Sequence, residues 1–245
     1  GGAVGSVAAD RARRSAEARD LDPGDYEVVL LPVAAAEVFR FLGNYGFNGR
    51  SVTEDTSFLR VGEQQLDAAL TVVDDVTDPR SVGIGFDIEG TPKHPLALVE
   101  AGVTVAAVHD RRTARKAGVD STGHANDLWD SPVPANLVVT PGTASVDELV
   151  AGVERGLVVT ELHYSRVLDP KTLVVTGLTR NGTFLVEGGR VVGAAGNLRF
   201  TQSFVEALGP GRVKGVGNDG LLVTGDVWTP SLHLARWSFT GGARG

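Results

Sequence analysis

The composition of the 245-residue chain excludes several functional classes before any motif is considered. The chain has no cysteine, so it offers no disulfide, cysteine-ligated zinc, iron–sulfur cluster or thiol nucleophile. Its 23 basic and 30 acidic residues give a net charge of -7, which provides no broad attractive field for phosphate backbones. No stretch reaches the roughly 18 consecutive apolar residues of a membrane span, and no signal-peptide pattern opens the chain. We therefore expect a cytoplasmic protein that binds neither nucleic acid nor membrane.

The first part of the chain reads as an accessory segment. Residues 7–20 are rich in alanine and in charges of both signs, and good helix formers predict a solvated helix or linker there. The turn signal LDPGD follows. We assign residues 1–25 to a helical linker or to the remnant of a missing N-terminal domain, and residues 26–245 to a single C-terminal domain.

A strand and a helix open this domain. DYEVVLLP is apolar and β-branched, which predicts a buried strand. Residues 34–42 then place their apolar side chains on one face of a helix. Three glycines at intervals of three residues follow the helix and should break it: Gly43, Gly46 and Gly49.

The middle of the chain alternates short strands with polar segments. LTVVDD and residues 96–100 and 103–108 predict strands, and EAGV predicts a hairpin turn between the last two. Residues 109–136 are polar and irregular, so we expect a surface excursion. SVDELVAGVERG predicts a helix in which Ser145 and Glu148 have capping-box spacing.

The C-terminal half is dominated by short strands. RNG and EGG predict successive hairpins, because asparagine and glycine tolerate positive φ. TQSFVEALG predicts a last short helix. Strands outnumber helices and connect mostly through short turns, which indicates an α+β protein whose sheet is mostly antiparallel or a partly closed barrel.

Two groups of polar residues could carry chemistry. FDIEG places Asp87 and Glu89 two residues apart, where they could hold a peptide amine, orient a base or simply cap loop amides. STGHA offers Thr122, Gly123 and His124 as further contacts for a cleft.

No familiar catalytic motif is present. The five histidines are scattered, with no two within one helical turn, so a zincin-type helix is excluded. His94, His109 and His124 could still meet Asp87 and Glu89 in space, although scattered loop histidines are more often exposed or hydrogen-bonded. The serines lack a G-x-S-x-G elbow, and GVGNDG matches neither a dinucleotide nor a phosphate loop.

Taken in order, several segments resemble the TldD/PmbA family, also called modulators of DNA gyrase. The segments are DYEVVLLPVAAAEVFRFL, FNGRSV, TVVDD, FDIEGTPKHPLALVEAGV, DRRTARKAG, STGHA and RGLVVTELH followed by VTGLTRNGTFLVEGGRVV. The resemblance runs from about Tyr26 to Gly241. It implies a dimeric intracellular peptidase in which a TldD-type subunit holds zinc through H-E-x-x-x-H and a cysteine, whereas the TldE/PmbA-type partner lacks these ligands. Members of the family have a further N-terminal domain.

The resemblance places the metal motif on the helix at residues 33–45. The two histidine positions fall on Arg40 and Tyr45, the glutamate on Phe41, and the cysteine near Val216. Arginine keeps its proton, phenylalanine has no base and tyrosine is a rare zinc ligand. All the ligands are therefore missing together, so we expect no catalytic residue, metal or cofactor in this chain.

Three functional hypotheses follow. The first is a metal-free, non-catalytic TldE/PmbA-type subunit that pairs with a zinc-bearing TldD-type subunit, encloses unfolded peptides and accepts a separate N-terminal piece of its own fold. The second is an active metal-dependent peptidase with a relocated site of histidines and carboxylates. The third is a stand-alone peptide-binding scaffold.

Overall fold

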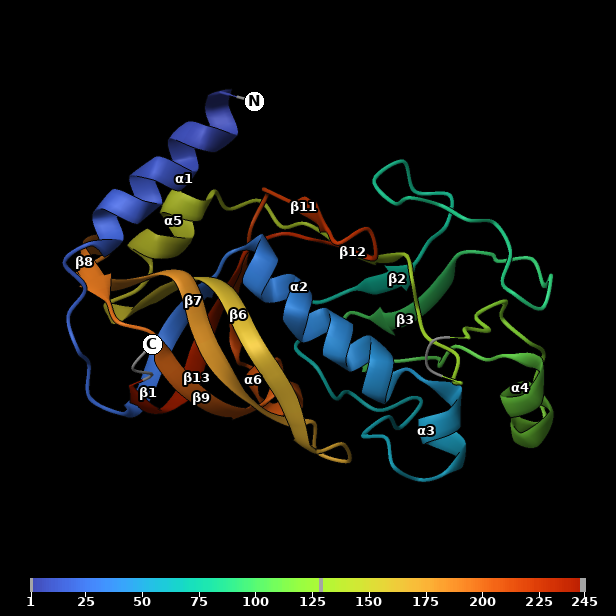
Figure 1. The fold of residues 1–245 in the computed structure, drawn as a ribbon. Helices are drawn as coiled ribbons and strands as arrows, with labels where there is room; N and C mark the ends of the chain where they lie inside the picture. Colours follow the sequence, from blue (N-terminus) through green and yellow to red (C-terminus); the bar gives the residue numbers. More distant parts are fainter. Residues whose placement is uncertain (1, 128–129, 243–245) are drawn as a thin grey trace.

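The computed structural model describes residues 2–127 and 130–242 (Figure 1). The helices are α1 (Gly2–Ser15), α2 (Pro32–Phe41), α3 (Gly49–Thr53), α4 (Arg111–Ala117), α5 (Val146–Ala151) and α6 (Phe204–Ala207), and a π-helical turn η1 (Leu42–Gly46) follows α2 directly. The strands are β1 (Gly24–Leu30), β2 (Val72–Asp74), β3 (Leu96–Glu100), β4 (Val103–Thr104), β5 (Leu137–Val139), β6 (Arg155–Asp169), β7 (Val174–Glu187), β8 (Arg190–Ala195), β9 (Leu198–Ser203), β10 (Val213–Val216), β11 (Leu221–Val223), β12 (Val227–Thr229) and β13 (Leu232–Gly242). The chain is α+β, as the sequence predicts.

A closed barrel forms one half of the molecule. The strands pair in the order β1, β6, β7, β9 and β13, and β1 returns to pair with β13, so the barrel is closed rather than partly closed. Aromatic side chains fill its interior. Trp237 is fully buried, with ring centroids 5.5 Å from Phe200 and 5.4 Å from Phe204. Closure leaves these barrel strands paired on both sides over much of their length, which removes most exposed edges.

A second sheet forms the other half. Its strands follow the order β11, β12, β5, β2, β3 and β4. Helix α2 lies between the two halves, where it contacts β6 of the barrel and β11 and β12 of the second sheet (Figure 1). Pro32 stands at the start of α2, a position where its missing N–H is no loss. The helix is buried at Ala34, Ala35 and Ala36, whose small side chains allow close packing.

The predicted hairpin at RNG is wrong. Strand β7 runs without interruption through Asn181 and Gly182, which have φ values of 58° and 117°. The register with β6 shifts between Val159 and Glu161, so the two positive φ values produce a bulge instead of a turn. A small barrel requires strongly coiled strands, and a bulge supplies that bend. The hairpin expected at Gly188 and Gly189 is present between β7 and β8.

Residues 109–136 are more than a surface excursion. They contain α4, which begins at Arg111 and is capped by Asp110, whose carboxylate accepts a 2.6 Å hydrogen bond from the amide of Thr113. Helix α4 ends at Gly118 with φ of 71°, a left-handed cap. His109, His124 and other polar residues of this segment are buried. The sequence pattern missed this helix because α4 is short and its face toward the core is polar.

The helix or linker predicted over residues 7–20 is helical only in its first part, since α1 spans Gly2–Ser15 and residues 16–20 continue in non-helical conformation. Arg19 forms a parallel bridge with Ala195, so this connection lies beside β8. Across residues 2–127 and 130–242, no helix has the length and hydropathy needed to cross a bilayer.

Candidate functional site

The winding changes from α2 to η1 within residues 33–45, the segment in which the metal motif was expected. The π-turn η1 closes with a 2.9 Å hydrogen bond from the amide of Phe47 to the carbonyl of Leu42. Gly46 and Gly49 then pass tightly against neighbours. A Cβ at Gly46 would lie 2.0 Å from the ring of Phe58, and one at Gly49 would lie 2.4 Å from the ring of His109. These glycines are thus required by close packing and do not act only as helix breakers.

Arg40 makes a chelating ion pair at the end of α2. Its Nε donates to Asp226 Oδ2 at 2.7 Å, its Nη2 donates to Asp226 Oδ1 at 2.9 Å, and its Nη1 donates to Glu37 at 2.9 Å. Nη2 also contacts the hydroxyl of Thr224. This bidentate geometry is the strongest form of arginine–carboxylate contact.

The two charges stabilise each other. Hydrogen bonding to Asp226 raises the pKa of Arg40 further above its ordinary value. Burial would raise the pKa of Asp226, but the hydrogen bonds from Arg40 and Thr224 outweigh burial and lower that pKa. The position that the resemblance assigns to a metal-binding histidine therefore holds a permanent cation.

The other three motif positions are apolar or aromatic. The rings of Phe41 and Tyr45 lie 5.6 Å apart, and the ring of Phe41 packs edge-on against Phe204 at 5.8 Å. Val216 is buried in β10 opposite Leu232. Together with Arg40, these side chains supply no imidazole, carboxylate or thiolate for a divalent cation.

Asp226 and Glu37 were missed by the sequence analysis. Glu37 precedes Arg40 by three residues, a spacing at which side chains on a helix meet, so this contact was detectable. Asp226 lies 186 residues away from Arg40 in sequence, in the turn between β11 and β12. No local pattern in the sequence links the two.

Asp87 and Glu89 order loops and do not converge. The buried carboxylate of Asp87 accepts the amides of Glu89 at 3.0 Å, Thr91 at 2.9 Å and Ala125 at 2.9 Å. Glu89 accepts the amide of Arg111, the first residue of α4, at 3.0 Å. These contacts correspond to the capping role considered from the sequence.

A buried chain of hydrogen bonds joins Thr122, His124 and Asp74. His124 Nε2 lies 3.0 Å from Asp74 Oδ1, and His124 Nδ1 lies 2.9 Å from Thr122 Oγ1. Asp74 Oδ2 accepts the amides of Ala135 and Asn136 at 2.9 Å each. Burial would raise the pKa of Asp74, but the hydrogen bond with His124 and the amide donors outweigh burial and lower it.

The order of acid, imidazole and hydroxyl in this chain is that of a catalytic triad, yet its surroundings are structural. His124 is buried, and the hydroxyl of Thr122 already accepts the amide of His109 at 2.7 Å. Gly123 has φ of 75° and lies against Pro92, where a Cβ would be 2.6 Å from the carbonyl oxygen. The arrangement fastens residues 109–136 to β2 and leaves no room for a substrate.

The histidines considered for a relocated metal site do not assemble one. His94 is exposed, whereas His109 is buried beside Thr113, with Nδ1 3.2 Å from its hydroxyl. Burial lowers the pKa of His109 and favours its neutral form. Within the described residues, no three side chains of histidine, cysteine, aspartate or glutamate are grouped so that they could hold a metal ion.

The chain belongs to the PmbA/TldD family. The family model for the PmbA/TldA metallopeptidase C-terminal domain matches residues 23–241, nearly the whole chain. The resemblance inferred from the sequence segments is therefore confirmed.

Individual relatives agree with this assignment. A metalloprotease of Methanothermobacter thermautotrophicus is 23% identical over 221 residues, which is 88% of this chain and 48% of that protein. A TldD metalloprotease homologue of Haemophilus influenzae is 28% identical over 120 residues, 46% of this chain and 25% of its own length. The crystal structure of TldE from Thermococcus kodakarensis has the same fold, with a TM-score of 0.86 at 22% identity over 96% of this chain and 55% of that chain. The chain spans about half the length of the Methanothermobacter and Thermococcus proteins.

Proposed function

We propose that the chain is a metal-free, non-catalytic subunit of TldE/PmbA type that joins a zinc-bearing TldD-type metallopeptidase and helps to enclose unfolded peptides. The observation that carries the proposal is the Arg40–Asp226 ion pair beside the aromatic pair of Phe41 and Tyr45. Arg40, Phe41 and Tyr45 occupy positions at which the resemblance implies the metal-binding motif. A fixed guanidinium repels a divalent cation, and the aromatic rings offer it no ligand.

An exposed apolar hairpin supports the proposal that a partner protein binds this chain. The loop between β2 and β3 exposes four large apolar side chains at alternate positions, each between 61% and 64% exposed: Val82, Ile84, Phe86 and Ile88. The hairpin is held by a bridge between Phe86 and Pro92 and by a 3.0 Å hydrogen bond from Lys93 to Gly85. Grouped exposed apolar side chains are typical of surfaces that a partner covers.

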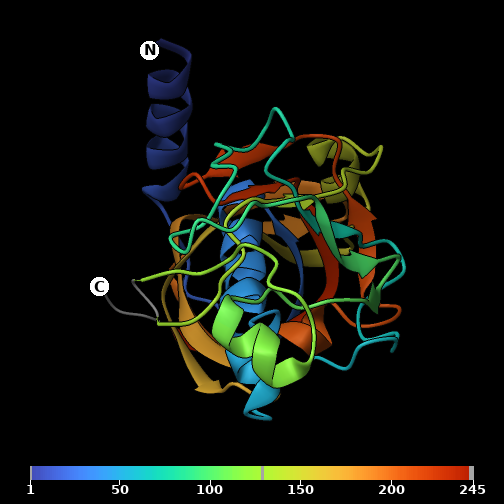
Figure 2. The same cartoon turned by 90° about the vertical axis from the view of Figure 1, so that its right-hand side faces the viewer.

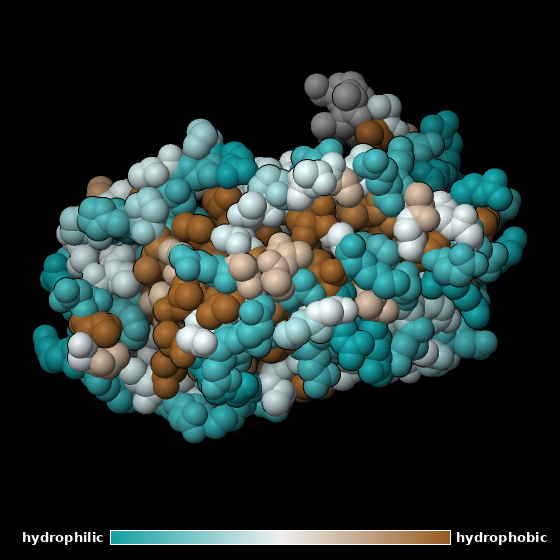
Figure 3. Space-filling view, turned by 180° about the vertical axis from the view of Figure 1, so that it is seen from behind, coloured by the Kyte–Doolittle hydropathy of each residue, from teal (hydrophilic) through white to brown (hydrophobic). Residues whose placement is uncertain are grey.

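The hairpin stands at the end of the molecule away from the barrel. Figure 2 views that end and shows the loop between β2 and β3 together with α4. Hydrophobic residues also appear across the middle of the face opposite to that of Figure 1 (Figure 3). The apolar surface available to partners is thus not limited to the hairpin.

Native mass spectrometry with a TldD-type subunit tests this proposal. We expect the chain to carry no metal and to enter a complex of defined stoichiometry with that subunit. Tightly bound zinc in a one-to-one ratio to this chain would contradict the proposal and would favour an active peptidase. Absence of a complex would instead favour a stand-alone peptide-binding scaffold.

Substitution in the hairpin locates the contact. Phe86→Asp should weaken the complex at least tenfold, because the charge would have to be desolvated at the interface. Val61→Asp is the matched control, since Val61 is equally exposed but lies outside the hairpin. Equal binding by both variants would place the contact elsewhere.

A further inference from the structure

A cleft unrelated to the motif positions lies between α1 and the barrel. Its volume is about 700 Å³, within the range of small-ligand sites, and its walls come from α1, β6, β7 and the turn between β8 and β9. The start of α2 contributes Val33. None of the four motif positions and none of the loop residues considered above lines it.

The walls of the cleft suit the backbone of a peptide. Most lining residues are alanine, glycine, serine or threonine, so the walls contain few large side chains that would select a particular shape. Thr160 is buried, and its hydroxyl is already satisfied by the carbonyls of Arg180 at 3.0 Å and Gly182 at 2.8 Å. The bulge in β7 places Asn181 at the wall, and its amide donates to Glu161. Bulges and positive φ values are common beside binding sites.

One cation faces the cleft without a counter-ion. Arg11 lines it from α1, and its guanidinium has no hydrogen-bond or ion-pair partner among the described residues. Glu161, the acidic residue of the lining, already accepts from Asn181 and lies 3.8 Å from the ring of His163. An unpaired guanidinium in a partly enclosed site favours a planar carboxylate, which it can bind through two hydrogen bonds.

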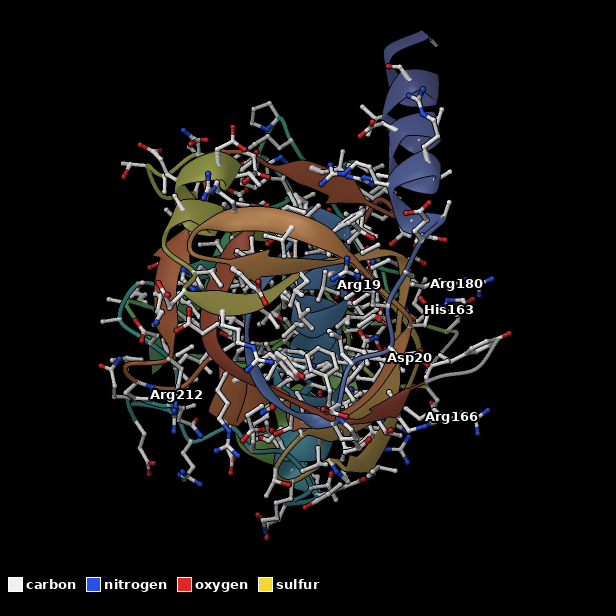
Figure 4. The ribbon with its side chains drawn as sticks, turned by 90° about the vertical axis from the view of Figure 1, so that its left-hand side faces the viewer. Arg19, Asp20, His163, Arg166, Arg180 and Arg212 are labelled. Carbon is white, nitrogen blue, oxygen red and sulfur yellow. The ribbon has the colours of Figure 1, made fainter. Side chains whose placement is uncertain are left out.

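A second cation lies next to the cleft. Arg180 Nη1 lies 2.5 Å from His163 Nε2. On β7, Arg180 is the register partner of Glu161, a residue of the lining. Figure 4 shows Arg180 and His163 side by side at the edge of β6 and β7, with Arg166 farther along the same edge. Among the described residues, Arg166 has no carboxylate partner, and the guanidinium of Arg180 has only His163 as a hydrogen-bond partner. This edge thus carries two guanidinium groups, with the carboxylate of Glu161 beside Arg180. The carboxylate of Asp20 stands at another part of the lining, where a Cβ at Gly196 would lie 3.5 Å from its Oδ1.

We propose that this cleft binds the C-terminal carboxylate of an extended peptide. Arg11 receives the carboxylate, the small residues accommodate the last residues of the peptide, and Arg180 and Arg166 attract acidic side chains that precede them. That the ligand is a peptide rests on the proposed function. The preference for a carboxylate rests on the charges of the cleft itself.

Calorimetric titration of the full chain tests the proposal with two peptides that differ at one group. The probes are N-acetyl-tetra-alanine with a free carboxylate and the same peptide with a C-terminal amide. We expect the acid to bind at least tenfold more tightly than the amide. Equal binding of the two peptides, or no binding of either, would overturn the proposal.

Variants of α1 assign the contact. Arg11→Gln should weaken binding of the peptide with the free carboxylate at least tenfold and leave binding of the amidated peptide unchanged. Arg13→Gln is the control on the same helix, because the side chain of Arg13 is 78% exposed and, within the described part of the chain, pairs only with Asp10, at 3.9 Å. If both variants lose affinity for the acid peptide to the same degree, the peptide is attracted by the overall charge of α1 and not bound at a site formed by Arg11.

Small anions separate a peptide site from a general anion site. Acetate and inorganic phosphate should displace the acid peptide only at concentrations at least a hundredfold higher, because they lack the backbone that fills the cleft. Displacement at equal concentrations would reduce the cleft to a small-anion site and overturn the peptide assignment. Peptide binding without complex formation with the TldD-type subunit would refute the proposed function alone, and complex formation without peptide binding would refute this inference alone.

Discussion

The two halves of the molecule are stabilised by different kinds of contact. The barrel buries large aromatic and aliphatic side chains around Trp237 and joins long strands in extended ladders that bulges interrupt. The second sheet has short strands, and Asp74 fastens the long segment after β4 to it through His124 and two backbone amides. An apolar core loses stability in proportion to the area and volume removed, whereas a buried carboxylate leaves several donors unsatisfied when it is lost. The comparison predicts that the barrel tolerates small changes better than the second sheet.

The largest effect should come from the barrel interior. We expect Trp237→Ala to lower the free energy of unfolding by about 4 kcal/mol, the usual range for removing a buried aromatic side chain. Among residues 2–127 and 130–242 the indole N–H has no hydrogen-bond partner, so the effect comes from lost packing. Denaturant unfolding measures it, with Arg236→Ala, an exposed neighbour, as control. A loss under about 1.5 kcal/mol would contradict an apolar core centred on Trp237.

The next effect tests the polar half. Asp74→Asn should lower the free energy of unfolding by about 3 kcal/mol, because it removes one partner of a buried pair. Hydrogen exchange should show the loss of protection in β2 and β5 before β6 and β7. Asp75→Asn, one residue along the chain, should change stability by less than about 1 kcal/mol. Uniform loss of protection would mean that the two halves unfold as one unit.

Lowering the pH should destabilise both halves of the molecule. Burial lowers the pKa of His109 beside the second sheet and of His233 in β13, where Glu27 only partly opposes it. The unfolded chain therefore takes up protons first, and stability should begin to fall as the pH drops below about 6.5. Each histidine contributes a slope of up to about 1.4 kcal/mol per pH unit.

Unfolding at a series of pH values separates the two histidines. His233→Gln should remove one contribution and leave that of His109. Asp74 acts at lower pH, because its pKa lies below the ordinary aspartate value and its stabilisation is lost only as the pH falls through that lowered value. Stability that does not change between pH 7 and pH 5 would contradict the burial argument.

The smallest effect should come from the Arg40–Asp226 ion pair, which joins α2 to the second sheet. Arg40→Gln should lower the free energy of unfolding by about 1 kcal/mol, since the pair is only partly shielded from water. Arg50→Gln, which removes more exposed pairs with Glu54 and Asp130, should have about half that effect. Thermal unfolding of both variants checks the order. Similar losses in both would mean that the bidentate geometry of Arg40 adds nothing.

The sequence could predict what depends on neighbouring residues. The capping box of Ser145 and Glu148 is present with both of its hydrogen bonds, and the strand before α2 and the turn at Gly188 were found from local patterns. The family also followed from short segments in order. The prediction was limited to contacts within a few residues, over which periodicity and turn preferences act.

The remaining features depend on contacts that are distant in sequence. The bulge at Asn181 had the same local signal as a hairpin, and only barrel closure decides between them. Asp226 meets Arg40 across 186 residues, and Asp74 meets His124 across 50. Arg11 looked like one charge among many on a solvated helix, and only the packing of α1 places it at a cleft. Such partners require the folded chain.

The π-turn η1 determines which substitutions this part of the helix can accept. In an α-helix, residues five apart point about 140° away from each other, and wider winding turns such positions closer together. Arg40 stands in the last turn of α2 and Tyr45 in η1, so the wider winding brings these two positions closer to the same side of the helix. Gly46 against Phe58 and the cap at Asn48 hold the backbone in place. The wide turn is thus held by glycine contacts and a helix cap, so substitution of Arg40 or Tyr45 should leave the course of the main chain unchanged.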